Sequence, residues 1–148
     1  MPIPPLDGDG LLPVGIHSCT IDEVDAVFGR FERSDRRMKL VAKLRTYFAE
    51  VQAVELVKFL IIDGSFVTSR EEPGDIDILL GLHADADLSK DFPPYVLNAI
   101  SKRTVHKRFG FDVLPASDGS DEYKKYLEFF SQVKGRIGRR KGLLKVTI

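Results

Sequence analysis

The longest helical pattern in the chain begins after Ser34 or Asp35, either of which can serve as an N-cap. From there the apolar positions recur at steps of three and four residues, at Met38, Val41, Leu44, Phe48 and Val51. That spacing places them on one face of a helix. We therefore expect a long amphipathic helix that packs this face against the rest of the domain.

Shorter helices are predicted over residues 20–28, 93–101 and 122–130. Thr20 is a suitable N-cap for the first of them, and Gly29 is a suitable residue to end it. Proline favours the start of the second, because it fits the first turn of a helix. In the third, the apolar residues again return at helical spacing.

Strands are predicted over residues 58–63, 75–80, 109–114 and 142–148. The first is apolar on both faces, which is typical of a central strand. The second alternates carboxylates with aliphatic side chains, the period-two pattern of a strand with two different faces. Pro115 is expected to end the third.

Together these elements predict a single domain over residues 1–148 with an α/β (α+β) fold, in which helices cover a small mixed β-sheet. The chain has 148 residues, 43% of them hydrophobic and 30% charged, which suits one globular domain with one core. Residues 1–16 are rich in proline and glycine, which disfavour helix and sheet. We expect them to form an N-terminal arm that lies on the body of the domain.

Charge and hydropathy exclude several classes of function. The 22 basic and 22 acidic residues give a net charge of zero, so nucleic acid is not expected as a partner. The apolar runs are too short and too interrupted by aspartate to cross a membrane. The N-terminus lacks the basic and apolar regions of a secretory signal, so we expect a cytoplasmic location. The basic residues within 101–108 are expected to form a solvated face.

The cysteine and histidine residues do not show the spacing of a metal site. Cys19 and His17 together offer two ligands, where zinc takes three or four. His83 and His106 are scattered along the chain. We expect structural or surface roles for all four residues.

Aspartates in strand-like sequence are the strongest candidates for chemistry. Asp75 and Asp77 are two residues apart on a predicted strand, so their carboxylates point to the same face. Asp112 lies in another apolar strand, where an unpaired carboxylate is costly. Clustered carboxylates with room for water and phosphate are what Mg²⁺ selects. We expect Asp75, Asp77 and Asp112 to be catalytic and to bind Mg²⁺ or Mn²⁺, although a solvated start of an edge strand would also explain the first two.

A turn for phosphate is predicted at Gly64 and Ser65, directly after the central strand. Glycine lets the backbone turn sharply and approach a ligand, and a serine hydroxyl beside free amides can bind phosphate oxygens. Ser69 and Arg70 are further phosphate-binding candidates. Asp63 adjoins the turn, but strand alternation does not fix its direction, and we do not assign it to the site.

The order of these motifs resembles the signature of the DNA polymerase beta type nucleotidyltransferase superfamily. An apolar strand, Gly64-Ser65, nine residues and then Asp75-x-Asp77 are followed by a segment, Phe111-Asp112-Val113, that looks like the third carboxylate. The whole chain is also similar to a small prokaryotic group of minimal nucleotidyltransferase-like domains. The resemblance implies a small mixed sheet with helices packed on one face, and Mg²⁺-dependent transfer of a nucleoside monophosphate from a nucleoside triphosphate.

Two hypotheses of function follow. The first is a nucleotidyltransferase that acts on a protein or a small molecule, with a protein partner or a homodimer completing the cleft of so short a chain. The alternative is a non-catalytic binding module of the same fold that works through a protein partner. Three aspartates favour the enzyme. Phe66, Val67 and Thr68 stand where minimal members carry a glycine with nearby arginines, which favours the binding module.

Overall fold

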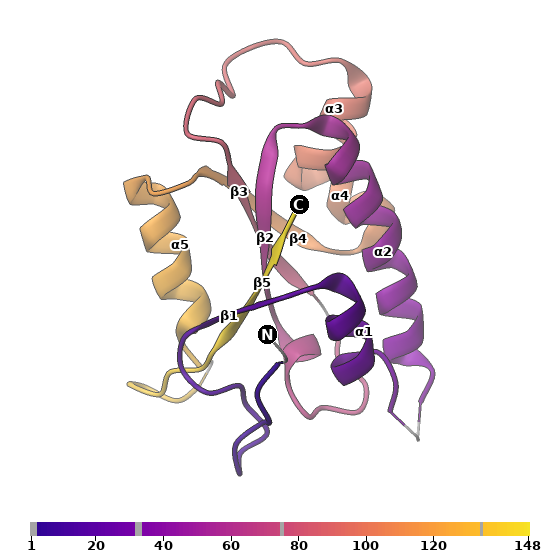
Figure 1. Ribbon diagram of the computed structural model, residues 1–148, viewed down its shortest axis with the longest axis vertical. Coiled ribbons are helices and arrows are strands. Elements are labelled where there is room, and N and C mark those ends of the chain that lie inside the picture. Colours follow the sequence, from indigo (N-terminus) through magenta and orange to yellow (C-terminus); the bar gives the residue numbers. More distant parts are fainter. Residues whose placement is uncertain (1–2, 32–33, 75, 134) are drawn as a thin grey trace.

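In the residues that this computed structural model describes, 3–31, 34–74, 76–133 and 135–148, the fold is built on a five-stranded mixed β-sheet (Figure 1). The strands are β1 (Ile16–Cys19), β2 (Val57–Asp63), β3 (Asp77–Leu82), β4 (Asp112–Ser117) and β5 (Leu143–Thr147). They lie in the order β1-β5-β2-β3-β4. β1 is parallel to β5 and β3 is parallel to β4, whereas β2 is antiparallel to both of its neighbours. The predicted α/β class and the central position of β2 are therefore confirmed.

The helices of the described residues are α1 (Ile21–Phe28), α2 (Arg36–Val54), α3 (Pro94–Ile100), α4 (Lys102–Phe109) and α5 (Asp121–Ser131), with a short 3-10 helix at Ser65–Val67. Thr20 caps α1 in a capping box with Glu23, as its sequence position predicts. Ser101 and Ser120 cap α4 and α5 with their side chains. Within the described part of the chain, no helix is both long enough and apolar enough to cross a membrane.

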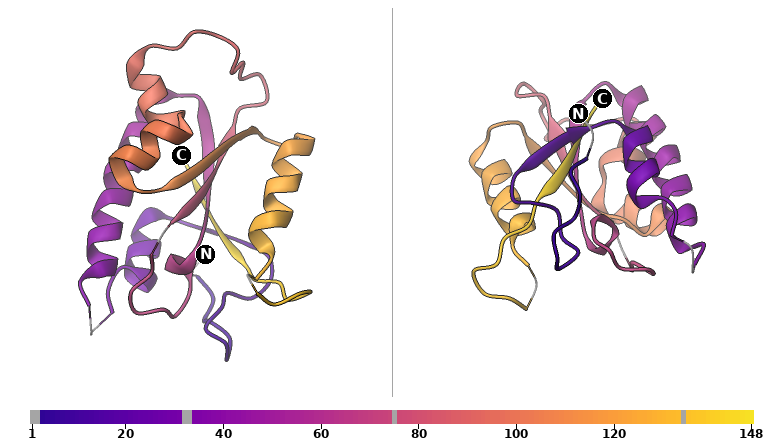
Figure 2. Two further views of the ribbon diagram at one scale, coloured as in Figure 1. Left: turned by 180° about the vertical axis from the view of Figure 1, so that it is seen from behind. Right: turned by 60° about the horizontal axis from the view of Figure 1, so that its bottom comes forward.

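The two faces of the sheet are covered by different helices (Figure 2). α1 to α4 pack on one face, around a large apolar core that contains Leu44, Leu60 and Phe66. α5 packs on the opposite face, over a smaller cluster that contains Phe59, Leu79 and Tyr123. The expectation of helices on one face is therefore corrected for α5. The second face of the sheet is also apolar along part of its length, so α5 is needed to bury it away from water.

Three parts of the chain show the main differences from the predicted elements. Residues 16–19 form a strand because their backbone pairs with β5, a tertiary contact that the local sequence does not show. Residues 102–109 form a capped helix rather than the lead-in to a strand. β4 begins at Asp112 and continues through Pro115. Proline has no N–H group to donate. It is tolerated in β4 because β4 is an edge strand, in which some N–H positions face away from the sheet.

The buried stripe of α2 is displaced from the predicted one. Met38 is 51% exposed, whereas Leu40, Tyr47 and the charged residue Arg37 are buried. The Tyr47 hydroxyl group donates a hydrogen bond of 2.6 Å to the carbonyl oxygen of Ala99 in α3. Polar side chains with hydrogen-bond partners thus occupy buried positions of α2 that the pattern of aliphatic residues does not include.

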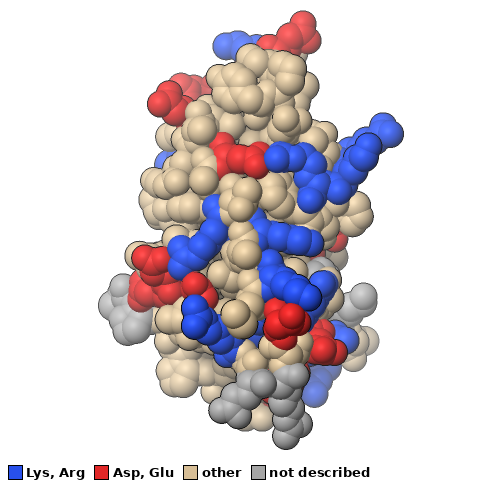
Figure 3. All heavy atoms as spheres, turned by 90° about the vertical axis from the view of Figure 1, so that its right-hand side faces the viewer, with Lys and Arg blue, Asp and Glu red and all other residues tan. Residues whose placement is uncertain are grey.

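The outer surface of the helical layer carries basic side chains interspersed with acidic ones (Figure 3). Arg45 of α2 forms ion pairs with Asp22 at 2.8 Å and Asp25 at 3.0 Å. Arg108 of α4 donates hydrogen bonds of 2.6 and 2.8 Å to the two carboxylate oxygens of Glu50. The basic residues of α4 are exposed, and Arg108 among them is paired with an acid.

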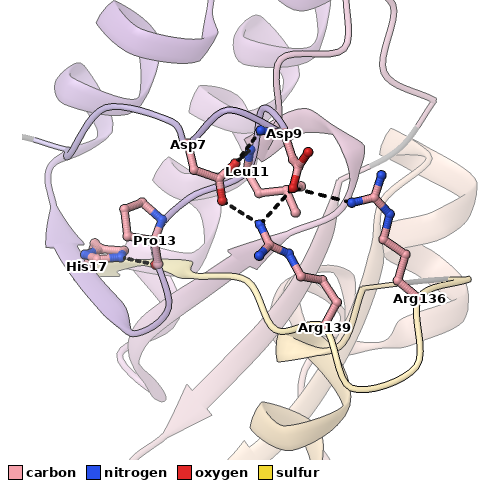
Figure 4. A network of polar contacts seen from close by, with 7 residues as sticks. All are labelled: Asp7, Asp9, Leu11, Pro13, His17, Arg136 and Arg139. Carbon is pink, nitrogen blue, oxygen red and sulfur yellow. Dashed lines mark hydrogen bonds and ion pairs between the residues drawn. The ribbon is translucent and has the colours of Figure 1, made fainter.

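The N-terminal arm is tied to the loop that precedes β5 (Figure 4). The side chain of Asp7 accepts hydrogen bonds from the backbone N–H groups of Asp9 and Leu11, which folds the arm back on itself. Arg139 forms ion pairs with Asp7 at 2.6 Å and Asp9 at 3.3 Å, and Arg136 forms one with Asp9 at 3.5 Å. These contacts place the arm on the body of the domain.

Candidate active site

An acidic row crosses three neighbouring strands at one end of the sheet. Asp63 of β2 is paired with Asp77 of β3, and Asp77 is paired with Asp112 of β4. Side chains of paired residues point to the same face of a sheet, with Cβ atoms roughly 5 Å apart. Exposure increases along the row, from the buried Asp63 (5%) through the half-buried Asp77 to the exposed Asp112.

The acidic row lies on the face that α5 covers in part. Asp63 is two residues from Ile61, and Asp77 is two residues from Leu79, so each pair of side chains points to one side. Ile61 and Leu79 belong to the cluster beneath α5. The side chain of Asp112 is 51% exposed, so solvent reaches the end of the row.

Of the aspartates predicted to form the site, Asp77 and Asp112 occupy paired positions on neighbouring strands. Asp75 lies outside the described residues. Asp63 was not assigned to the site from sequence, because its place in the row depends on the register between β2 and β3. Among the described residues, no group of three or more His, Cys, Asp and Glu side chains is arranged to hold a metal ion.

A largely buried lysine side chain neutralises the inner end of the row. Nζ of Lys141 lies 2.7 Å from Oδ1 of Asp63, and the two side chains are 13% and 7% exposed. A buried carboxylate requires such a partner, because desolvation otherwise disfavours its charged form. Lys141 therefore stabilises the charge of Asp63 beside Asp77.

A histidine lies at the outer end of the row. Nδ1 of His106, in the last turn of α4, is 3.2 Å from Oδ1 of Asp112. No sequence pattern indicates this contact, because the two residues are brought together by the turn between α4 and β4. The His106 ring is therefore placed to orient the carboxylate of Asp112.

The turn after β2 has the conformation that the sequence predicts for a glycine. Gly64 has a φ of 94°, a value that side chains with a Cβ rarely adopt. It directly follows Asp63, so the turn begins at the acidic row. Oγ of Ser65 accepts a hydrogen bond of 3.1 Å from the backbone N–H of Gly74, which draws the two ends of the loop together.

The rest of this loop is fixed by Arg37, a residue that the sequence analysis missed. Its guanidinium group is fully buried and donates hydrogen bonds to carbonyl oxygens of Phe28, Phe66, Thr68 and Arg70. Its central carbon also lies 3.9 Å from the centre of the Phe31 ring. Burial lowers the pKa of Arg37 to about 10, against the opposing influence of Glu71, so the group stays charged at neutral pH. One sequence signal could have indicated this role: Arg37 precedes Leu40 and Leu44 at helical spacing, on the buried side of α2.

The two remaining phosphate-binding candidates lie in the exposed part of the loop. The backbone N–H of Ser69 donates a hydrogen bond of 3.0 Å to the carbonyl oxygen of Gly10, so that group is committed to the arm. The carbonyl oxygen of Arg70 is held by Arg37, while its side chain is exposed. Gly64 and Ser65 are thus the candidates that adjoin the acidic row.

The chain belongs to the family of unknown function DUF6932, whose family model matches residues 4–147. Searches among curated proteins and among solved structures found no match to the chain. The matched range includes residues of the arm, the acidic row and the last strand.

Proposed function

We propose that the protein is a metal-dependent nucleotidyltransferase that moves a nucleoside monophosphate from a nucleoside triphosphate to an acceptor hydroxyl group. The observation that carries this proposal is the pairing of Asp77 with Asp112 next to the Gly64 turn. Carboxylates for a cation and a tight glycine turn for phosphate are thereby combined at one end of the sheet. That combination suits phosphoryl chemistry, in which positioning and charge neutralisation supply most of the rate.

The oxygen donors of the row fit Mg²⁺ or Mn²⁺, because hard cations prefer carboxylate ligands. Asp77 and Asp112 would hold the cation, with Asp75, outside the described residues, as the third ligand that the resemblance implies. Asp63 is neutralised by Lys141 and would support the site from the neighbouring strand. The bound cation would supply neutralisation of the phosphate charge.

In the proposed reaction, the acceptor oxygen forms a bond to the α-phosphorus of the triphosphate, and pyrophosphate leaves with the bridging oxygen. Asp112 would accept the proton of the acceptor hydroxyl group, and His106, at 3.2 Å, would orient its carboxylate. Gly64 and Ser65 would hold phosphate oxygens during the transfer. The residues of the loop after them would remain fixed by Arg37.

A second candidate function is a non-catalytic binding module that acts through a protein partner. The observation that favours it is the burial of Phe66 and Val67, which are 0% and 1% exposed. They fill the place where minimal nucleotidyltransferases carry a glycine with nearby arginines. The loop after Gly64 then contributes side chains to the hydrophobic core, and fewer polar groups remain to hold a triphosphate.

Thermal unfolding in the presence of Mg²⁺ and each common nucleoside triphosphate distinguishes the two candidates. For the enzyme, a triphosphate at a hundred times its Kd should stabilise the fold by about 2.7 kcal/mol, which raises the Tm by about 5 °C or more. Asp77→Asn should lose the shift, whereas Asp85→Asn, an exposed aspartate beyond the other end of β3, should keep it. Equal shifts in both variants would reject the assignment of the site, and no shift with any triphosphate would favour the binding module.

A further inference from the structure

A cleft of about 470 Å³ opens between β1, the second half of α5 and the start of β5. Its apolar lining comes from Val14, Ile16, Leu127 and Leu143, and Lys124 and Lys141 add positive charge. This volume lies within the range of about 300–1,000 Å³ that is usual for small-molecule sites. The cleft is therefore large enough for a compact organic molecule.

The cleft lies beside the acidic row in the order of the strands. Ile16 is paired with Leu143, and Ile62 is paired with Leu144 in the antiparallel register of β2 and β5. One step further along that register, Leu143 lies opposite Asp63. Because neighbouring strands are about 4.8 Å apart, Leu143 is roughly 10 Å from Asp77 in the direction across the sheet. A molecule lying over Leu143 can therefore reach the row.

Lys141 contacts both the cleft and the acidic row. It lines the cleft, and its Nζ is 2.7 Å from Oδ1 of Asp63. Asp63, the acid of the row nearest the cleft, is thus already neutralised, so the row does not repel a negatively charged ligand at this end. Glu128, the acidic residue of the lining, forms an ion pair with Arg140, which is also in the lining. Because these other charges are paired, Lys124 gives the cleft an excess of positive charge.

We propose that this cleft is the acceptor site, and that the acceptor is a small molecule with an apolar body, an anionic group and a hydroxyl group. The apolar body would lie against Ile16, Leu127 and Leu143, and the anionic group beside Lys124. The hydroxyl group would point along the sheet toward Asp77 and Asp112. The role of the cleft as an acceptor site rests on the proposed nucleotidyltransferase function. Ligand binding in the cleft can be tested without that function.

Two fluorescent probes on one aromatic framework test the cleft in the full-length protein. Anilinonaphthalene sulfonate has an apolar body and an anionic group, and phenylnaphthylamine is its neutral counterpart. Ile16→Trp should fill the cleft and weaken binding of both probes about tenfold or more. Lys124→Glu should weaken binding of the sulfonate about fivefold or more and leave the neutral probe unchanged. Val14→Trp, at a position that is 69% exposed, repeats the filling test if Ile16→Trp does not fold.

Matched controls lie on the same helix, outside the cleft. Lys125→Glu makes the same charge change one residue away, and Phe129→Ser removes a side chain that is 66% exposed. Both controls should bind the two probes as the wild type does. If all variants bind the probes equally, or if neither probe binds the wild type, the cleft is not a binding site and the proposal fails.

The thermal shift with Mg²⁺ and a triphosphate, measured on the same variants, separates this proposal from the proposed function. Ile16→Trp and Lys124→Glu should keep the full shift, because the nucleotide is assigned to the acidic row. Loss of the shift in these variants would place the nucleotide in the cleft and overturn the acceptor assignment. A wild type that binds the sulfonate in the cleft but shows no triphosphate shift would reject the nucleotidyltransferase and with it the acceptor role, while the ligand site would stand.

Discussion

The two faces of the sheet differ in how completely they are covered, and the candidate chemistry lies on the less covered one. The face under α1 to α4 holds the large core, where Leu44, Tyr47 and Phe66 are fully buried. The face under α5 holds the smaller cluster, and beyond it lie the cleft and the acidic row, whose outer end at Asp112 is exposed. One face thus supplies most of the stability, and the other has room for ligands. Substitutions on the two faces should therefore have different consequences.

The largest effect on stability is expected at Arg37, on the covered face. Arg37→Met removes the hydrogen bonds to the buried carbonyl oxygens of Phe28, Phe66, Thr68 and Arg70. Unsatisfied buried acceptors and a lost buried cation together should lower the free energy of unfolding by about 4 kcal/mol, measured by urea denaturation. Arg108→Met breaks an exposed ion pair with Glu50 and should cost less than about 1 kcal/mol. Similar losses in the two variants would mean that Arg37 does not fix the loop.

A somewhat smaller effect is expected from removing apolar side chains. Leu44→Ala in α2 leaves a cavity in the large core and should lower the free energy of unfolding by about 3 kcal/mol. Leu127→Ala in α5 removes a partly buried side chain beside the cleft and should cost about 1 kcal/mol. A loss at Leu127 as large as that at Leu44 would show that both faces contribute equally.

The reactivity of Cys19 gives a further test of the comparison. Cys19 packs against the large core, and burial, with a smaller contribution from the charge of Glu23, raises the pKa of its thiol from 9.0 to about 11. At pH 8 the thiolate fraction is then roughly a hundredth of that of an unperturbed thiol, so alkylation by iodoacetamide should be about a hundredfold slower. The protein unfolded in urea is the control and should react at the ordinary rate. A folded protein that reacts as fast as the unfolded one would contradict the burial of this edge of the sheet.

Local patterns in the sequence predicted most of the elements but not the way in which they meet. Asp77 and Gly64 could be identified because strand alternation and glycine chemistry are properties of short segments. Asp63 was noticed but not assigned to the site, because its place depends on strand register. His106 and Lys141 were missed as neighbours of the site, because their contacts depend on how separate elements meet. Such contacts join residues far apart in the chain, or on separate elements, and no spacing rule within one element reveals them.

The role of Arg37 was missed for a different reason. An arginine at the start of a helix is usually solvated, and the aliphatic pattern of α2 is complete without it. Its burial depends on carbonyl oxygens that the loop after Gly64 turns inward. The loop that contains Phe66 and Val67 is therefore held by an arginine from another helix.

The most direct test of the central claim is release of pyrophosphate from nucleoside triphosphates in the presence of Mg²⁺ and the small-molecule fraction of a cell extract. The wild type and Asp85→Asn should release pyrophosphate with at least one triphosphate and attach the labelled nucleotide to a small molecule. Asp77→Asn should be slower by about a hundredfold or more, because it removes a charge that stabilises the transition state. Release that is equal in Asp77→Asn and the wild type, or absent with every common triphosphate, would contradict the assignment of the acidic row as an active site.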